Sequence, residues 1–225
     1  MNPGAIVFDL DGTLIDGYDA IEEALAHAVK TLGKEPPGPG RVREMVGHGL
    51  ETLLEQAVGP ADAAEGVRLF RDYYPEVAIE KSRLLPGVPE VLERLARQGY
   101  AMSLASNKPL RFSRLILESK NVAGYFRGFA GPDATHAPKP DPSMLRALMV
   151  EIGAAPEATV CVGDMEVDVE FARAGGCRAV VLPTGSRSRA FLETAGADLL
   201  IDDLSELPDA LALLWRAPFA GGSAH

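Results

Sequence analysis

Two aspartates, Asp9 and Asp11, follow a short apolar run at residues 5–8 and stand two positions apart. A run of this kind, bounded by turn residues, is typical of a strand buried on both faces, so the carboxylates would lie where it ends. Side chains two apart in extended chain point the same way. Buried carboxylates repel each other unless hydrogen bonds or a cation compensate them. The pair therefore predicts a site for a divalent metal ion and a substrate, with one carboxylate as nucleophile and the other as proton donor.

Gly12 and Thr13 complete this string and favour a phosphorylated substrate. Gly12 has no Cβ, which would let a phosphate approach the backbone, and Thr13 adds a hydroxyl donor. An Asp-Gly pair alone is a common turn. The prediction therefore depends on positive charge and further metal ligands elsewhere in the chain.

Lys139 is the first candidate for that positive charge. It lies in Ala-Pro-Lys-Pro-Asp-Pro at residues 137–142, where the prolines fix its backbone and forbid a helix. Such a lysine is often only a surface residue of a loop. Near Asp9, however, its ammonium group would offset the repulsion between the carboxylate and a phosphoryl oxygen.

Ser106 and Asn107 form a second candidate anion site, because they end an apolar run and open a helix. A serine hydroxyl beside backbone N–H groups at a helix N-terminus suits a phosphate. Simple helix capping by either residue is the alternative.

Asp164 and Asp168 are the further metal-ligand candidates, since they follow the apolar run at residues 158–162. Asp164 would reach a hard cation such as Mg²⁺, which prefers oxygen ligands. Asp168 would be either a ligand or an outer group that orients one. An acidic first turn of a helix is the alternative.

The composition is that of a soluble globular protein and limits the possible partners. The 225 residues are 47% hydrophobic and carry a formal net charge of −10, which disfavours binding to a nucleic-acid backbone. No segment approaches a membrane span or a signal peptide, so a cytoplasmic protein with no membrane partner is expected. Cys161 and Cys177 lie in apolar runs and are expected to be buried free thiols.

Alternating strand and helix patterns predict an α/β fold: a Rossmann-like, doubly wound parallel sheet as the core, with an inserted α-helical cap domain. Residues 1–16 and 85–225 would form the core, and residues 17–84, which contain no convincing strand, the cap. The strands are expected near residues 5–8, 100–105, 126–130, 158–162, 177–182 and 198–201. Residues 221–225 are expected to be a frayed tail. Ligands of such sheets bind beyond the carboxyl ends of the strands, where the polar residues above fall.

The four polar segments resemble, in content and order, the four motifs of the haloacid dehalogenase-like hydrolase superfamily. These are Phe-Asp-Leu-Asp-Gly-Thr, Ser106-Asn107, Lys139 between prolines, and Gly-Asp-x-x-x-Asp at residues 163–168. Within it, the chain is most similar to phosphoglycolate phosphatases, through residues 41–50, Leu-Pro-Gly-Val at 85–88 and Lys-Pro-Asp-Pro at 139–142. The dehalogenases lack an acid at the position of Asp11, which argues against dehalogenation.

The resemblance implies a Mg²⁺-dependent phosphomonoester hydrolase. Asp9 would form an aspartyl-phosphate, and Asp11 would act as general acid and then base. Asp9, the Asp11 backbone carbonyl and Asp164 would bind Mg²⁺. Lys139, Ser106 and the Gly12 amide would hold the phosphoryl oxygens.

The cap would select a small phosphorylated metabolite, with 2-phosphoglycolate expected. His48 or Arg41 would contact a substrate carboxylate, although each also fits a solvated surface residue. Three alternatives stay open: a phosphatase for another small metabolite, a sugar phosphomutase with His27 as base, and a non-catalytic binding protein. Either a monomer or a homodimer fits the sequence.

Overall fold

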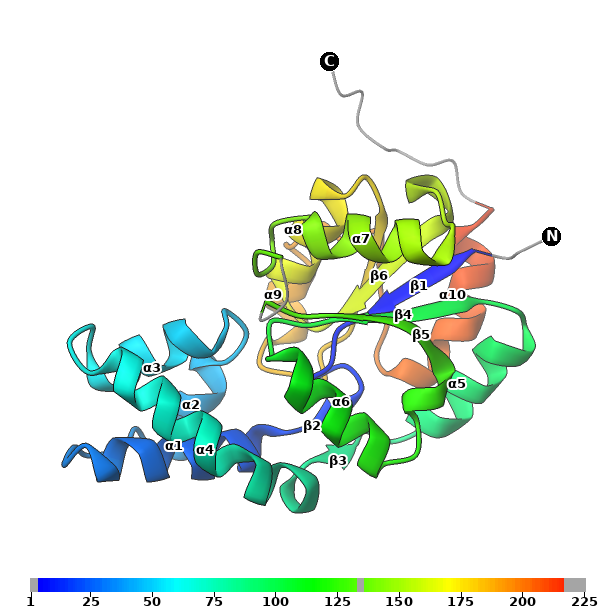
Figure 1. Cartoon of the computed structure of the whole chain (residues 1–225). Helices are drawn as coiled ribbons and strands as arrows, with labels where there is room; N and C mark the ends of the chain where they lie inside the picture. The colour runs from blue at the N-terminus through cyan, green and yellow to red at the C-terminus, as the bar shows by residue number, and fades with distance from the viewer. Residues whose placement is uncertain (1–3, 133–135, 217–225) are drawn as a thin grey trace.

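The computed structural model describes residues 4–132 and 136–216. The residues of the expected tail, 221–225, lie outside the described part of the chain. Figure 1 shows a sheet with helices on both faces and a separate group of helices beside one end of it.

The sheet confirms the predicted α/β core. Its six parallel strands run in the order β5-β4-β1-β6-β7-β8. The strands are β1 (Ala5–Phe8), β4 (Ala101–Ala105), β5 (Phe126–Ala130), β6 (Thr159–Gly163), β7 (Arg178–Val181) and β8 (Leu199–Leu200). All four residues of β1 are buried, because the strand lies between two neighbours and under helices on both faces.

Alternate residues of β1 belong to two different hydrophobic cores. Ile6 and Phe8 pack in a large core that also contains residues of α5 (Val88–Arg97), α6 (Leu110–Ser119) and α10 (Leu207–Leu214). Val7 packs on the opposite face, against α7 (Ser143–Ile152) and α8 (Glu166–Ala174). This alternation is what a doubly wound sheet requires of its central strand.

Four helices follow β1 and form what is called here the helical unit. They are α1 (Tyr18–Thr31), α2 (Pro39–Met45), α3 (Leu50–Val58) and α4 (Ala63–Lys81). Leu54 and Tyr74 are completely buried in this unit. Pro75 lies inside α4 without dividing it.

One expectation about this region is wrong. Residues 83–84 form a short strand, β3 (Arg83–Leu84), which pairs antiparallel with β2 (Ile15–Asp16). Two residues are too few to show the alternation of apolar and polar side chains that is typical of a strand, so the sequence does not predict β3. The pairing arises because the chain enters and leaves the helical unit side by side (Figure 1).

Smaller elements complete the chain. Single 3₁₀ turns occur at Ala123–Tyr125, Pro156–Ala158 and Leu204–Glu206, and a short helix, α9 (Arg189–Leu192), was not expected from the sequence. Ser188 caps α9 by accepting a hydrogen bond from the Phe191 N–H.

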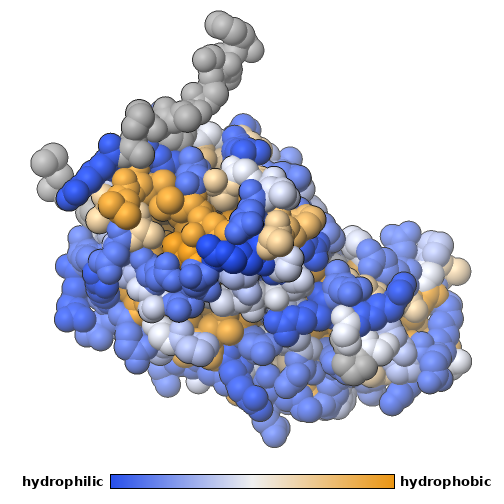
Figure 2. Space-filling model, turned by 180° about the vertical axis from the view of Figure 1, so that it is seen from behind, coloured by the Kyte–Doolittle hydropathy of each residue, from blue (hydrophilic) through white to orange (hydrophobic). Residues whose placement is uncertain are grey.

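Figure 2 shows a mostly hydrophilic face, with its largest apolar area on the sheet-containing part of the molecule and not on the helical unit. In the described part of the chain, none of the helices combines the length and apolarity needed to cross a membrane. Cys161 and Cys177 are buried free thiols, as predicted.

Candidate active site

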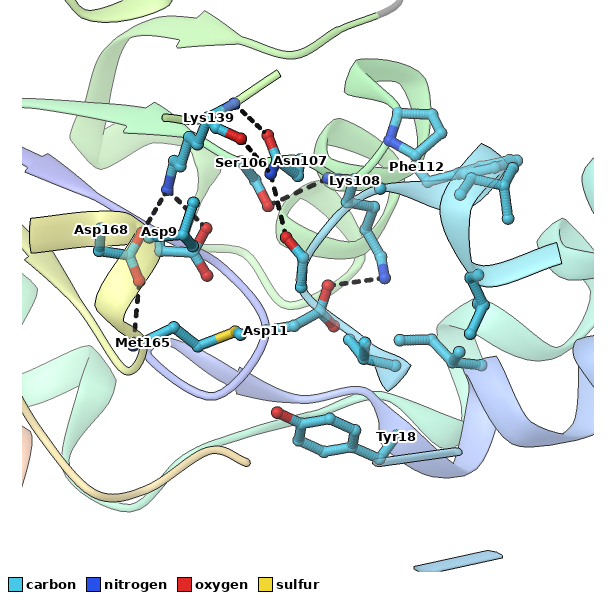
Figure 3. Close-up of a pocket in the computed structure, with 18 of the residues that line it drawn as sticks. Asp9, Asp11, Tyr18, Ser106, Asn107, Lys108, Phe112, Lys139, Met165 and Asp168 are labelled. Atoms are coloured by element: carbon cyan, nitrogen blue, oxygen red, sulfur yellow. Dashed lines mark hydrogen bonds and ion pairs between the residues drawn. The ribbon is translucent and has the colours of Figure 1, made fainter. Parts of the chain in front are cut away.

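The carboxyl ends of three neighbouring strands bring the predicted residues together. Phe8 of β1 pairs with Leu104 of β4 and with Val162 of β6, so the residues that follow these strands share one edge of the sheet. Asp9 continues the ladder, because its N–H donates to the Val162 carbonyl at 2.8 Å. Asp9 and Asp11 line the same pocket, as the spacing predicted. Figure 3 shows this pocket with the carboxylates and lysines facing one another.

Lys139 provides the buried positive charge of the site. Its Nζ lies 2.8 Å from Oδ1 of Asp9 and 2.8 Å from Oδ1 of Asp168. Burial lowers the pKa of Lys139, but the two carboxylates outweigh burial and hold its pKa above the usual range. The lysine is therefore charged and fixed between two acids, rather than on the surface of a loop.

Asn107 explains how Lys139 is held. The Asn107 Oδ1 accepts a hydrogen bond from the Lys139 N–H at 2.7 Å, and its Nδ2 donates to the Lys139 carbonyl at 3.3 Å. The same Nδ2 donates to the carbonyl of Gly47, between α2 and α3, at 3.0 Å. Asn107 thus connects the β4 edge, the lysine loop and the helical unit. Ser106, next to it, lines the pocket and accepts the Lys108 N–H at 3.3 Å.

Asp168 has both carboxylate oxygens engaged by the protein. Oδ1 pairs with Lys139, and Oδ2 accepts the Met165 N–H at 3.1 Å at the start of α8. Burial raises the pKa of Asp168 to about 6, although Lys139 opposes the shift. These contacts favour the second of its two predicted roles, in which it orients Lys139 rather than binding a metal ion directly.

Asp164 is buried behind the loop that carries Gly12. Its Oδ1 accepts a bond from the Thr13 hydroxyl at 3.5 Å, and its Oδ2 accepts the Ser186 N–H at 3.3 Å. Gly12 has a φ of +87°, and a Cβ there would meet Asp164 Oδ2 at 2.5 Å. Glycine is thus required by conformation and by space.

The structure gives Gly12 and Thr13 contacts other than those expected. The Gly12 N–H donates to the Ile15 carbonyl at 2.8 Å within its own loop, and the Thr13 side chain is completely buried. Neither residue belongs to the described lining of the pocket. Their predicted contact with a phosphoryl group stays an untested prediction, and both residues also pack around Asp164.

Asp11 meets a cation that the sequence analysis did not assign. Its Oδ2 lies 2.7 Å from Nζ of Lys108, and both side chains are less than a tenth exposed. Oδ1 of Asp11 is buried and accepts no hydrogen bond from the described residues. Burial raises the pKa of Asp11, while the Lys108 charge opposes the shift.

A divalent cation fits the charge balance of this edge. Asp9, Asp164 and Asp168 are all buried, and Lys139 compensates only part of their charge. Burial raises the pKa of Asp164 well above its usual range, and the charges of Asp168 and Asp9 add to the effect. Among the described residues, no three His, Cys, Asp or Glu side chains are placed to hold a metal ion together. Two carboxylates and one backbone carbonyl, completed by substrate and water oxygens, are ligand types that Mg²⁺ prefers, and this predicted set stays untested.

Apolar side chains from the helical unit form the far wall of the pocket. The lining there comprises Ile21, Val46, Leu50, Leu53, Phe70 and Tyr74, with Pro109 and Phe112 from the sheet side. Gly47 and Gly49 also line it, whereas Arg41 and His48 are exposed and absent from the described lining. Their predicted contacts with a substrate stay untested predictions. His27 likewise points elsewhere and stacks on Tyr73, with ring centroids 4.1 Å apart.

Two groups of residues were missed from the sequence. Lys108 directly follows the Ser-Asn pair, and this position at a strand end was the available signal. Residues 184–186 (Thr-Gly-Ser) follow the β7 strand and pack on the Asp164 loop, where the Thr184 hydroxyl donates to the Gly12 carbonyl. The turn residues that follow the fifth strand of the sheet were the sequence feature that could have identified that loop.

The sequence matches the family described as haloacid dehalogenase-like hydrolase over residues 6–182. The chain belongs to this family. It is a hydrolase of phosphoric monoesters, in a family whose phosphatases generally depend on a metal ion.

Named relatives narrow the resemblance to phosphoglycolate phosphatases. The chain is 35% identical over 214 residues to a phosphoglycolate phosphatase of Pseudomonas putida, and the matched region covers 91% of this chain and 78% of the relative. It is 34% identical to a phosphoglycolate phosphatase of Vibrio parahaemolyticus, and the matched region covers 92% of this chain and 96% of the relative. A crystal structure of a predicted phosphoglycolate phosphatase from Haemophilus somnus superimposes with a TM-score of 0.85 at 27% identity, covering 92% of this chain and 97% of that one.

Proposed function

We propose that this chain hydrolyses 2-phosphoglycolate in a Mg²⁺-dependent reaction that passes through an aspartyl-phosphate on Asp9. The observation that carries the proposal is the buried set of Asp9, Lys139 and Asp168 at the end of the central strand, with Asp11 on the same pocket. The activity named for the relatives supports the choice of substrate.

In the first step, a carboxylate oxygen of Asp9 forms a bond to phosphorus while the bond from phosphorus to the ester oxygen breaks. Asp11 gives its proton to that departing oxygen. Burial raises the pKa of Asp11, which favours the protonated form that this role needs. Lys139 and Ser106, which both line the pocket, would hold the phosphoryl oxygens through the ammonium group and the hydroxyl.

In the second step, water attacks the phosphorus atom and the Asp11 carboxylate takes the water proton. The bond between phosphorus and Asp9 breaks, which releases phosphate and restores the free carboxylate. Asp9, Asp164 and the Asp11 carbonyl would hold Mg²⁺, which supplies positive charge to the phosphoryl oxygens when bound.

The test is phosphate release from a panel of phosphomonoesters with Mg²⁺ and with EDTA. The panel contains 2-phosphoglycolate, sugar phosphates, pyrophosphate and nucleotides. We expect a clear preference for 2-phosphoglycolate, loss of activity in EDTA and recovery when Mg²⁺ is added back. Activity spread evenly over the panel would refute the substrate assignment, and isomerised sugar phosphate in place of free phosphate would favour the phosphomutase.

Asp9→Asn tests the nucleophile. The amide cannot form the acyl phosphate, so we expect activity to fall at least about a thousandfold. Asp19→Asn is the matched control, because Asp19 is an exposed carboxylate in the first turn of α1. Full activity in Asp9→Asn would show that the reaction does not use Asp9.

A further inference from the structure

Lys108 is a buried cation at the junction of the sheet and the helical unit. It follows Asn107 at the carboxyl end of β4, and its Nζ lies 2.7 Å from Asp11 Oδ2. The same Nζ lies 5.0 Å from the ring centroid of Tyr74 on α4, close enough for a cation–π contact. Burying a long charged side chain is costly, so its position calls for a partner.

The pocket contains only two basic side chains among its described lining residues, Lys139 and Lys108. Lys139 is held by two carboxylates, Asp9 and Asp168. Lys108 is paired with one carboxylate, that of Asp11. An ammonium group has three N–H donors, so Lys108 has donors to offer beyond the bond to Asp11.

The order of these groups along the pocket fits a short substrate. Figure 3 shows Asp11 between the Lys139–Asp9 pair and Lys108, with the apolar wall beyond. A phosphoryl group at Asp9 and Lys139 would place the departing ester oxygen at Asp11. The atoms attached to that oxygen would then come next to Lys108.

We propose that Lys108 is a specificity-determining residue that binds the carboxylate of the substrate's leaving group. The class of substrate is a short organic acid esterified to phosphate, in which one carbon atom separates the ester oxygen from the carboxylate. This inference rests on the proposed phosphomonoesterase function of the same site. A carboxylate entering a pocket with apolar walls loses its hydration and needs a cation, and Lys108 supplies it. Neutral leaving groups gain nothing from that cation.

The experiment compares two substrates of similar size, 2-phosphoglycolate and ethyl phosphate, which differ in a carboxylate against a methyl group. The measured quantity is the ratio of their kcat/KM values. In the unmodified protein we expect a ratio of at least about a hundred in favour of 2-phosphoglycolate, because a site built for a polar group rejects the analogue that lacks it. A ratio near one would overturn the inference while leaving the phosphatase intact. No phosphate release from any ester would instead refute the proposed function.

Lys108→Met removes the charge and keeps the apolar length of the side chain. We expect the ratio to fall about a hundredfold, with most of the change in KM for 2-phosphoglycolate. Lys30→Met is the matched control, because Lys30 is an exposed lysine in the last turn of α1. Loss of the same factor for both substrates would show that Lys108 only positions Asp11 and would overturn the proposal.

Lys108→Arg is a second variant that keeps the charge, so it controls for a folding defect in Lys108→Met. It retains the charge, so we expect it to keep a preference for 2-phosphoglycolate even if its absolute activity falls. Equal loss of that preference in Lys108→Arg and Lys108→Met, with native thermal unfolding of both, would contradict a role that depends on charge.

Discussion

At the scale of single residues, the proton donor gives the sharpest prediction. Asp11→Asn removes the proton that the glycolate oxygen needs on leaving, but p-nitrophenolate leaves without one. We therefore expect the variant to lose about 10²–10⁴-fold in turnover of 2-phosphoglycolate. With p-nitrophenyl phosphate it should release one burst of p-nitrophenolate per enzyme molecule and then slow, because the second step lacks its base. Rapid mixing detects the burst, and equal losses in the first step for both esters would contradict the role of Asp11.

The same scale shows what residue types and spacing can and cannot predict. Asp9 and Asp11 share a pocket because two positions of extended chain put side chains on one side, and that rule needs no tertiary information. Lys108 needed the packing of α4 behind it to become a buried partner of Asp11. A lysine at the start of a helix is usually solvated, so its position at a strand end indicates closeness to the site but does not predict its burial against Asp11.

At the scale of elements, the loop between β1 and β2 depends on one glycine. Gly12→Ala would strain a backbone with φ of +87° and place a Cβ 2.5 Å from Asp164 Oδ2 and 2.8 Å from Gly185 Cα. We expect about 2–5 kcal/mol loss in the free energy of unfolding, with loss of phosphatase activity. Denaturant unfolding measures the first quantity.

Gly33→Ala separates strain from crowding in that experiment. Gly33 has a comparable φ of +72°, but nothing lies within 4 Å of the position of its missing Cβ. The cost there should be about 1 kcal/mol, with activity unchanged. Equal costs in the two variants would mean that the contact with Asp164 contributes nothing.

Helices and strands were predictable where the hydrophobic pattern of the sequence extends over a whole helix, or where a strand is apolar on both faces. The central strands are short apolar runs bounded by turn residues, and helix α3 has a clear apolar face, so both follow from local sequence. Pro75 lies inside α4, where a proline normally interrupts the helical hydrogen bonds, yet the helix continues to Lys81. The pair β2–β3 depends on two distant chain segments that meet only after the helical unit has folded.

At the scale of the whole molecule, the relation between the sheet and the helical unit was the least predictable feature. The sequence indicates that a helical segment is inserted, because strand patterns stop after the first motif and resume later. How that segment meets the sheet depends on side chains far apart in sequence. Tyr74 of α4 packs against Phe112 of α6 with ring centroids 4.8 Å apart, and Asn107 bonds to Gly47 across the same junction.

Tyr74→Ala tests whether this junction holds the two parts together. Tyr74 is completely buried, so we expect a loss of about 3–5 kcal/mol in the free energy of unfolding and a marked fall in kcat/KM. Tyr73→Ala is the control: Tyr73 belongs to the same helix, but its contacts with Glu23 and His27 stay inside the helical unit. It should cost less and leave kcat/KM nearly unchanged. If both variants lost activity equally, the internal order of the helical unit, and not its contact with α6, would control the pocket. Because Tyr74 also lines the pocket and contacts Lys108, the difference between the neighbouring tyrosines measures the combined contribution of the junction and of this pocket wall to catalysis.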